Sequence, residues 1–193
     1  MFMLSSFDLK SRVKKVAEEP VSTFSNIAYP IAGVTAAYVA EGGPVLELMI
    51  IITTLSMGLG SALFHARQTH FFQKLDELNM YALLLSVLAF RVGEPWLALA
   101  VVVLSAGAGM VHQKLSSTIT VGMLGMLNIA VIGWQTGNWY MTALILAVFL
   151  MSYGVRQLGE TWYNKGEIVP YDMMHGIWHL GTAYVIFLML IAN

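Results

Sequence analysis

Residues 44–66, PVLELMIIITTLSMGLGSALFHA, form an apolar stretch long enough to cross a lipid bilayer as one helix. A hydrocarbon core of about 30 Å requires about 20 consecutive, mostly apolar residues. Similar stretches recur along the chain, and we predict spans at 21–40, 44–66, 74–92, 95–113, 116–135, 138–157 and 171–191. The sequence therefore predicts an all-α membrane protein, folded as a seven-transmembrane-helix bundle.

The composition agrees with a membrane protein. Of 193 residues, 58% are hydrophobic and 11% are charged, and the mean hydropathy is +0.70. Soluble domains carry about 25% charged residues. A net charge of −1 argues against a nucleic-acid partner, and the absence of cysteine excludes disulfides and thiolate sites. Residues 1–19 are polar and charged, so we expect no cleavable signal peptide.

The connections between the predicted spans are short, and only residues 158–170 are expected to form a longer loop. Short connections place consecutive helices side by side and antiparallel. We therefore expect a short N-terminal cytoplasmic segment, residues 1–20, followed by a single transmembrane domain, residues 21–193.

Basic residues set the expected orientation. With seven spans, nine of the ten basic residues fall on one side of the membrane and only Arg91 falls on the other. The nine are Lys10, Arg12, Lys14, Lys15, Arg67, Lys74, Lys114, Arg156 and Lys165. The positive-inside rule then predicts a cytoplasmic N-terminus and an external C-terminus in a multi-pass integral membrane protein.

Three histidines lie at the predicted cytoplasmic ends of the spans. His65 ends the second span, and His175 and His179 begin the seventh. Residues four apart share one helix face, so His175 and His179 can hold one ion together. Three imidazoles are typical zinc ligands and leave a fourth position open for water or substrate. We predict a Zn²⁺ site at His65, His175 and His179.

Two further polar residues lie at the same predicted depth. Asp76, at the start of the third span, is placed to orient a water molecule or to act as its general base. Ser61, one turn before His65, could stabilise an oxyanion or support a ligand. The His175–His179 pair alone could equally pack against a neighbouring helix. His70 and His112 fit no ligand spacing and are interpreted as interfacial residues.

The motifs around these residues resemble those of the alkaline ceramidases. The motifs are GLGSALFH (58–65), LDELNM (75–80) and HGIWH (175–179). Alkaline ceramidases belong to the CREST superfamily of seven-helix membrane hydrolases, to which the adiponectin-type receptors are related. Their signature is Ser-x3-His in helix two, an Asp at the start of helix three and His-x3-His in helix seven.

The resemblance implies a zinc-dependent hydrolysis of ceramide to a sphingoid base and a fatty acid. It implies His65, His175 and His179 as zinc ligands, and Asp76 and Ser61 as catalytic partners. The substrate would be a lipid that enters from the bilayer, with the active site toward the cytoplasmic side. The short connections favour a bacterial, inner-membrane member, for which another lipid amide or ester is an alternative substrate.

The resemblance is weaker at the N-terminus. Eukaryotic ceramidases bind calcium through an acidic N-terminal cluster, whereas here Glu18 and Glu19 follow a basic stretch, residues 10–15. The sequence therefore gives no basis for assigning a calcium site near Glu19. Two other functions remain: a receptor or sensor with a structural zinc, and a transporter. A receptor would be expected to carry a soluble signalling region, and transporter sites usually lie near the bilayer midplane. The sequence makes no prediction of oligomeric state.

Overall fold

The computed structural model describes residues 18–40, 42–94, 96 and 117–192. These residues contain helices and no strands, which confirms the predicted all-α class for this part of the chain. The helices are α1 (Pro20–Ser25), α2 (Ala28–Val39), α3 (Pro44–Arg67), α4 (His70–Val92), α6 (Ser117–Thr136), α7 (Trp139–Asn164) and α8 (Ile168–Ile191). The predicted span 95–113 lies outside the described residues except for Trp96, so the count of seven spans stays a prediction.

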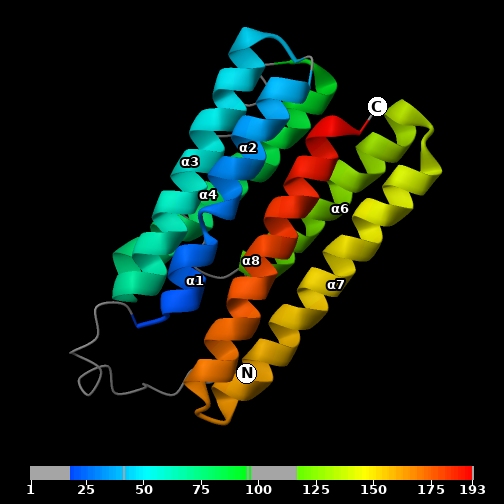
Figure 1. Cartoon of the computed structure of the whole chain (residues 1–193). Helices are drawn as coiled ribbons and strands as arrows, with labels where there is room; N and C mark the ends of the chain where they lie inside the picture. Colours follow the sequence, from blue (N-terminus) through cyan, green and yellow to red (C-terminus); the bar gives the residue numbers. More distant parts are fainter. Residues whose placement is uncertain (1–17, 41, 95, 97–116, 193) are drawn as a thin grey trace.

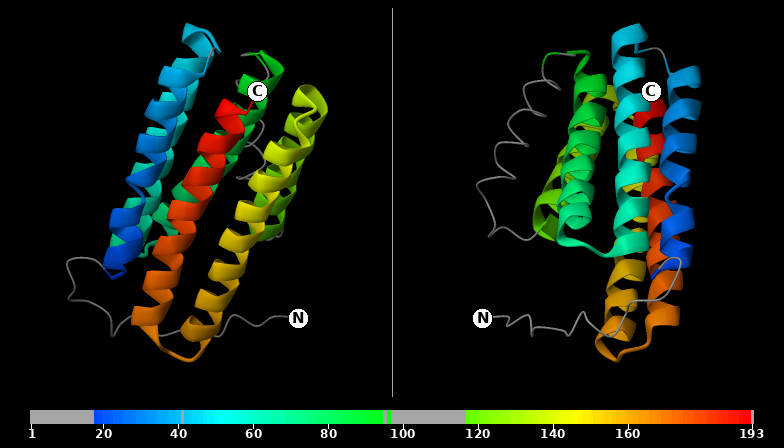
Figure 2. Two further views of the ribbon diagram at one scale, coloured as in Figure 1. Left: turned by 45° about the vertical axis from the view of Figure 1, so that its right-hand side comes forward. Right: turned by 90° about the vertical axis from the view of Figure 1, so that its left-hand side faces the viewer.

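The helices form one bundle with α8 at its centre (Figures 1 and 2). Helix α8 contacts α1, α2, α4, α6 and α7. Half of the most apolar 18-residue stretch of α8 is buried, which agrees with this central position. Helices α3 and α4 form an antiparallel pair on one side of α8, and α7 runs antiparallel to α8 on the other. The end of α3, the start of α4 and the start of α8 consequently lie at the same end of the bundle.

The first predicted span, 21–40, is not one continuous helix. It divides into α1 and α2 at Asn26 and Ile27. Pro30 has no amide hydrogen, so it cannot donate to the carbonyl of Asn26 four residues earlier. Helix α3 passes directly against this break: a Cβ atom on Gly58 would lie 2.7 Å from Cδ of Pro30 and 2.9 Å from the carbonyl oxygen of Asn26. Only glycine permits that approach.

The loop predicted over residues 158–170 is also wrong. Helix α7 continues to Asn164 and α8 begins at Ile168, which leaves a tight turn. Hydropathy ends the span too early because the last turns of α7 are polar. Those turns are nevertheless packed on the start of α8: Gly159 is buried against Met174, and the rings of Tyr163 and Tyr171 lie 4.9 Å apart.

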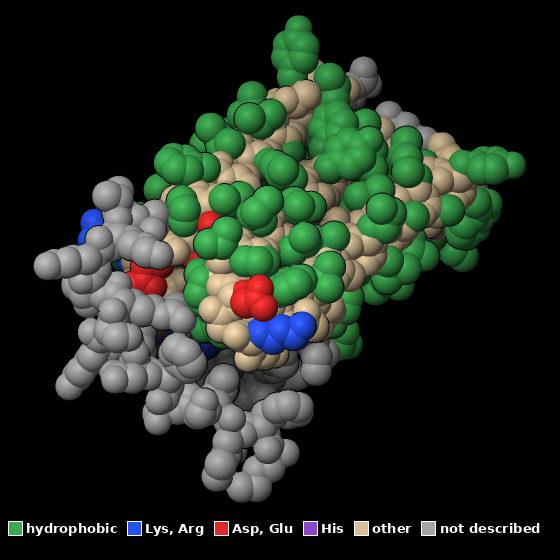
Figure 3. All heavy atoms as spheres, turned by 60° about the horizontal axis from the view of Figure 1, so that its bottom comes forward, with side chains coloured by type: hydrophobic (Ala, Val, Ile, Leu, Met, Phe, Trp, Pro, Cys, Tyr) green, Lys and Arg blue, Asp and Glu red, His purple; other side chains and the backbone are tan. Residues whose placement is uncertain are grey.

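Three of the described helices are long and apolar enough to cross a membrane: α3, α7 and α8, whose best windows have mean hydropathies of 1.7, 1.5 and 1.5. The outer surface of the bundle is also apolar. Figure 3 shows hydrophobic side chains over most of the visible flank. Large apolar side chains along the described helices are exposed, such as Leu59 of α3 at 64% and Leu180 of α8 at 52%. Such an exposed apolar surface suits lipid better than water, so the described part of the fold is compatible with a helical membrane protein.

Candidate metal centre

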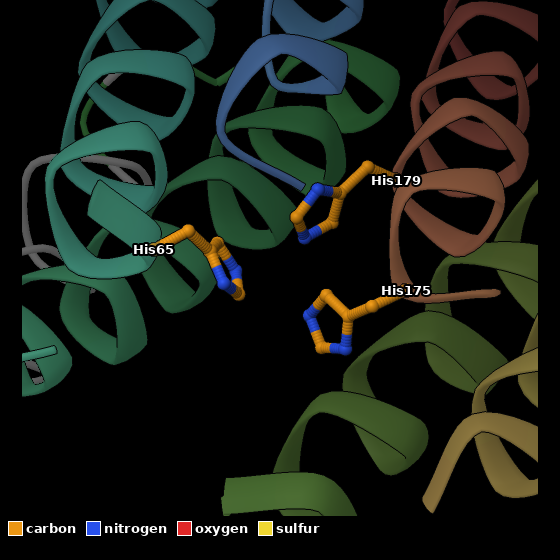
Figure 4. A group of neighbouring side chains, drawn as sticks. All are labelled: His65, His175 and His179. Atoms are coloured by element: carbon orange, nitrogen blue, oxygen red, sulfur yellow. The ribbon is translucent and has the colours of Figure 1, made fainter. Parts of the chain in front are cut away.

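The three predicted ligands meet at one end of the bundle. His65 projects from the last turn of α3, and His175 and His179 project from the first half of α8 (Figure 4). The ring centres lie 4.7 Å apart for His65 and His175, 5.0 Å for His65 and His179, and 4.7 Å for His175 and His179. One nitrogen from each ring lies within 4.8 Å of the others.

This cluster is buried. His65 and His179 are each 1% exposed, and His175 is 8% exposed. Burying three imidazoles together is unfavourable unless their polar nitrogens find partners. A shared cation meets that need, because each ring offers it a lone pair. The cluster can therefore hold a metal ion, and its donor set of three imidazoles is one that zinc accepts.

The outer nitrogen of His65 is bonded to a carboxylate. Nδ1 of His65 lies 2.6 Å from Oε2 of Glu19, which is 3% exposed. The carboxylate accepts a hydrogen bond from Nδ1–H, and the lone pair of the ring is then on Nε2, where it is free to bind a metal. Metal-binding histidines usually have such a partner, which sets the tautomer and the ring orientation.

His179 is oriented in the same way from α1. Its Nδ1 lies 3.2 Å from the carbonyl oxygen of Ser22 and 3.0 Å from Oγ of Ser25. Because a carbonyl oxygen can only accept, Nδ1 must be the donor. The lone pair of His179 is then on Nε2, as in His65. In two of the three rings the hydrogen bonds made by Nδ1 thus leave Nε2 free to bind a metal.

The two residues predicted to be catalytic lie near His65, at the same end of the bundle. Asp76 is near the start of α4 and interacts electrostatically with His65. Asn79, one turn later, donates to the carbonyl oxygen of Ser56 at 2.8 Å and so holds α4 against α3. Ser61 is 1% exposed and lies close enough to the carboxylate of Asp76 to interact with it.

Asp76 and Ser61 both retain unused polar atoms. Within the described part of the chain, neither Oδ1 of Asp76 nor Oγ of Ser61 forms a hydrogen bond of normal geometry, although both are buried. Leaving such an atom unsatisfied costs about 1–3 kcal/mol. The carboxylate of Asp76 and the hydroxyl of Ser61 thus form a buried polar pair near a cluster able to bind a metal, and both retain capacity for further hydrogen bonds.

A narrow apolar cavity of about 50 Å³ adjoins the centre. Its lining includes Tyr29, Met57, Leu84, Phe149, Trp178 and Ile186. The ring of Trp178 connects the two sites, since it lies 5.0 Å from that of His175 and 5.2 Å from that of His179. An apolar cavity therefore lies near the histidine cluster, with the ring of Trp178 between the two.

Sequence reasoning missed the residues that hold the ligands in place. Glu19, Ser22 and Ser25 precede or belong to α1, which hydropathy assigned to a simple span. The sequence predicts no contact between Glu19 and His65, whereas the structure joins the two side chains. An acidic residue just before an apolar span was the available signal, but its partner is 46 positions away. Of the remaining histidines, His70 is exposed and His112 lies outside the described residues.

Comparison with known proteins identifies the family. The model of the Ceramidase family matches residues 12–170. No curated protein and no solved structure gives a significant match. The matched range contains Ser61, His65 and Asp76 and ends before His175. The proximity of the α8 histidines to the matched residues is therefore seen in the structure and not in the family match. With most of its length matched, the chain belongs to the ceramidase family of amide hydrolases.

Proposed function

We propose that the protein is a zinc-dependent hydrolase of lipid amides within the membrane, with a ceramide-like lipid as substrate. The observation that carries this proposal is the convergence of three buried histidines beside the unsatisfied polar atoms of Asp76 and Ser61. A zinc that served structure alone would normally have four protein ligands. Here the three imidazoles lie near the carboxylate of Asp76, which can bind an attacking water molecule, and the hydroxyl of Ser61, which can donate to a substrate carbonyl oxygen.

The residues of the site divide the chemistry among them. When bound, zinc supplies a Lewis acid and lowers the pKa of a water molecule to about 7. Asp76 orients the attacking water and accepts its proton. Ser61 donates its hydroxyl proton in a hydrogen bond to the carbonyl oxygen, where negative charge develops. His65, His175 and His179 hold the ion, and Glu19 holds His65.

The surroundings favour a lipid over a soluble amide. The cavity beside Trp178 is lined almost entirely by apolar side chains, and the flanks of the bundle expose apolar surface. A lipid could keep its tails in hydrocarbon while its amide reaches the histidines at one end of the bundle. Cleavage at that position yields an amine and a fatty acid.

The test is hydrolysis of a panel of lipids by zinc-loaded protein in vesicles. The panel contains ceramide, other N-acyl lipids and matched esters, and the released fatty acid is measured by mass spectrometry. We expect release from a lipid amide. If zinc-loaded protein cleaves none of these amides or esters, the receptor function with a structural zinc replaces this proposal.

Replacement of Ser61 by alanine should slow turnover by about 100-fold, at the lower end of the loss expected when one donor to an oxyanion is removed. The reason is that the zinc ligands and Asp76 remain, while one hydrogen bond to the developing charge is lost. Steady-state rates of fatty acid release measure the effect, with zinc content as the control. A Ser61→Ala variant as fast as wild type would remove Ser61 from the mechanism.

The proposed orientation places the N-terminus and the metal centre at the cytoplasmic side and the C-terminus outside. Arg67 ends α3, Lys74 lies in the first turns of α4 and Lys165 follows α7, all at the same end of the bundle as the histidines. Arg91 lies in the last turn of α4, at the opposite end. Reporter fusions at both termini test the orientation, and a cytoplasmic C-terminus would contradict it.

A further inference from the structure

The carboxylate of Glu19 is itself held in place by residues outside the metal centre. Its Oε2 accepts from His65, and its Oε1 accepts from the side-chain amide of Gln68. The backbone of Glu19 is also tied to α3, because its amide donates to the carbonyl oxygen of His65 at 3.3 Å. Glu19 thus contacts the end of α3 by both backbone and side chain.

Asp172 holds the helix that follows Glu19. Asp172 lies on α8, one turn before His175, and is 5% exposed. Its carboxylate accepts hydrogen bonds from the amides of Val21 (2.9 Å) and Ser22 (2.8 Å) and from the hydroxyl of Ser22 (2.6 Å). One carboxylate therefore satisfies two otherwise unpaired amides at the start of α1 and fixes that helix to α8.

The packing of α1 on α8 is close at this point. A Cβ atom on Gly176 would lie 2.7 Å from Cγ1 of Val21. Glycine at this position lets the backbone of α1 come near enough for Asp172 to reach it. The segment that carries Glu19 is consequently fixed to α8 on one side and to α3 on the other.

Gln68 adopts a backbone conformation that is unfavourable for it. It follows α3 with φ = 47°, and within the described residues it is the one non-glycine residue with positive φ. Glycine adopts this left-handed conformation without steric cost, whereas glutamine does not. Strained residues of this kind tend to occur where function requires the side chain. Here the side chain of Gln68 contacts Glu19.

We propose that Asp172 and Gln68 are positioning residues that hold Glu19, and through it His65, in the orientation required for metal binding. The inference rests on the proposed function in one respect, namely that the three histidines bind zinc. Neither residue touches the metal or the substrate. Asp172 acts by fixing α1 against α8, and Gln68 acts directly on the carboxylate of Glu19.

A purely structural role makes a different prediction. If Gln68 served only to end α3, Gln68→Gly would relieve its backbone strain and leave zinc affinity unchanged. The positioning role predicts that the same variant is at least as stable to heat as wild type and yet binds zinc more weakly. Gln68→Asn provides a second case: asparagine also tolerates positive φ, but its side chain is too short to reach Glu19.

The experiment measures zinc affinity of the full-length protein in detergent, by competition with a chromophoric chelator, together with thermal unfolding. Asp172→Asn, Gln68→Gly and Gln68→Asn should each bind zinc about 10-fold more weakly, in the range for residues that support metal ligands. Glu167→Gln is the matched control, since Glu167 is exposed at the start of α8 and its side chain caps nothing there. It should bind zinc as wild type does.

A double-variant cycle tests whether Asp172 acts on zinc binding through Glu19. Because Asp172 acts through Glu19, Asp172→Asn should weaken zinc binding less in a Glu19→Gln background than in wild type. Wild-type affinity in both Asp172→Asn and Gln68→Gly would overturn this inference and leave the proposed function standing. A wild-type protein that binds no zinc would overturn both. If Asp172→Asn fails to fold, the two Gln68 variants still decide the matter.

Discussion

Asp76→Asn should lower the rate of fatty acid release by a factor of about 100 or more, as expected for loss of a general base. Asparagine keeps the size of the side chain but cannot accept the proton of the attacking water. Zinc content should stay at the wild-type level, because Asp76 does not belong to the group of residues able to bind the ion. The rate and the metal content are measured on the same preparation.

The neighbouring carboxylate gives the matched control for this variant. Glu77 forms an ion pair with Lys74 at 2.8 Å, and pairs at such partly exposed positions contribute little to stability. Glu77→Gln should therefore retain nearly wild-type turnover. Hydrolysis at the wild-type rate by Asp76→Asn would show that the reaction does not use this carboxylate.

The double variant His175→Ala, His179→Ala should lose its zinc and its hydrolytic activity. Wild type should carry about one zinc per chain, as a single site with three histidine ligands implies. With both rings of α8 removed, one imidazole remains, which is too few to retain the ion. Metal content is measured by mass spectrometry after gel filtration in detergent.

His70→Ala is the control for this double variant, because His70 is exposed at the start of α4 and takes no part in the cluster. It should retain both zinc and activity. A folded His175→Ala, His179→Ala protein with its full zinc content would show that the ion is bound elsewhere.

The sequence predicted that the three histidines come together because they belong to helices whose ends are easy to place. His175 and His179 share a face by spacing alone. The alternation of spans then brings His65 to the same end of the bundle, and the structure places the three rings within reach of one ion. The common depth of the polar residues was therefore the most useful sequence observation.

The residues that support the cluster could not be predicted in the same way. Glu19 lies 46 positions from His65, and Asp172 lies 150 positions from Ser22. Such contacts depend on how closely two helices approach, which in turn depends on local features such as Gly176 against Val21. Periodicity reports which face of a helix is apolar, but not which distant helix packs on it.

The predicted helix boundaries were wrong for a related reason. Hydropathy finds the apolar part of a helix and not its hydrogen-bonded length. The polar end of α7 was assigned to a loop, although it continues as helix to Asn164 and packs on α8. In the first span the error was the opposite, because an apolar stretch conceals the break that Pro30 produces.

The central claim is that zinc at the three histidines is catalytic and not only structural. The most direct measurement is the release of fatty acid from ceramide in vesicles, before and after zinc is removed with a chelator and then restored. Release should stop when zinc is removed and resume when it is restored, while the helical content of the protein stays constant. Ceramide hydrolysis that continues at the same rate in zinc-free, folded protein would contradict it.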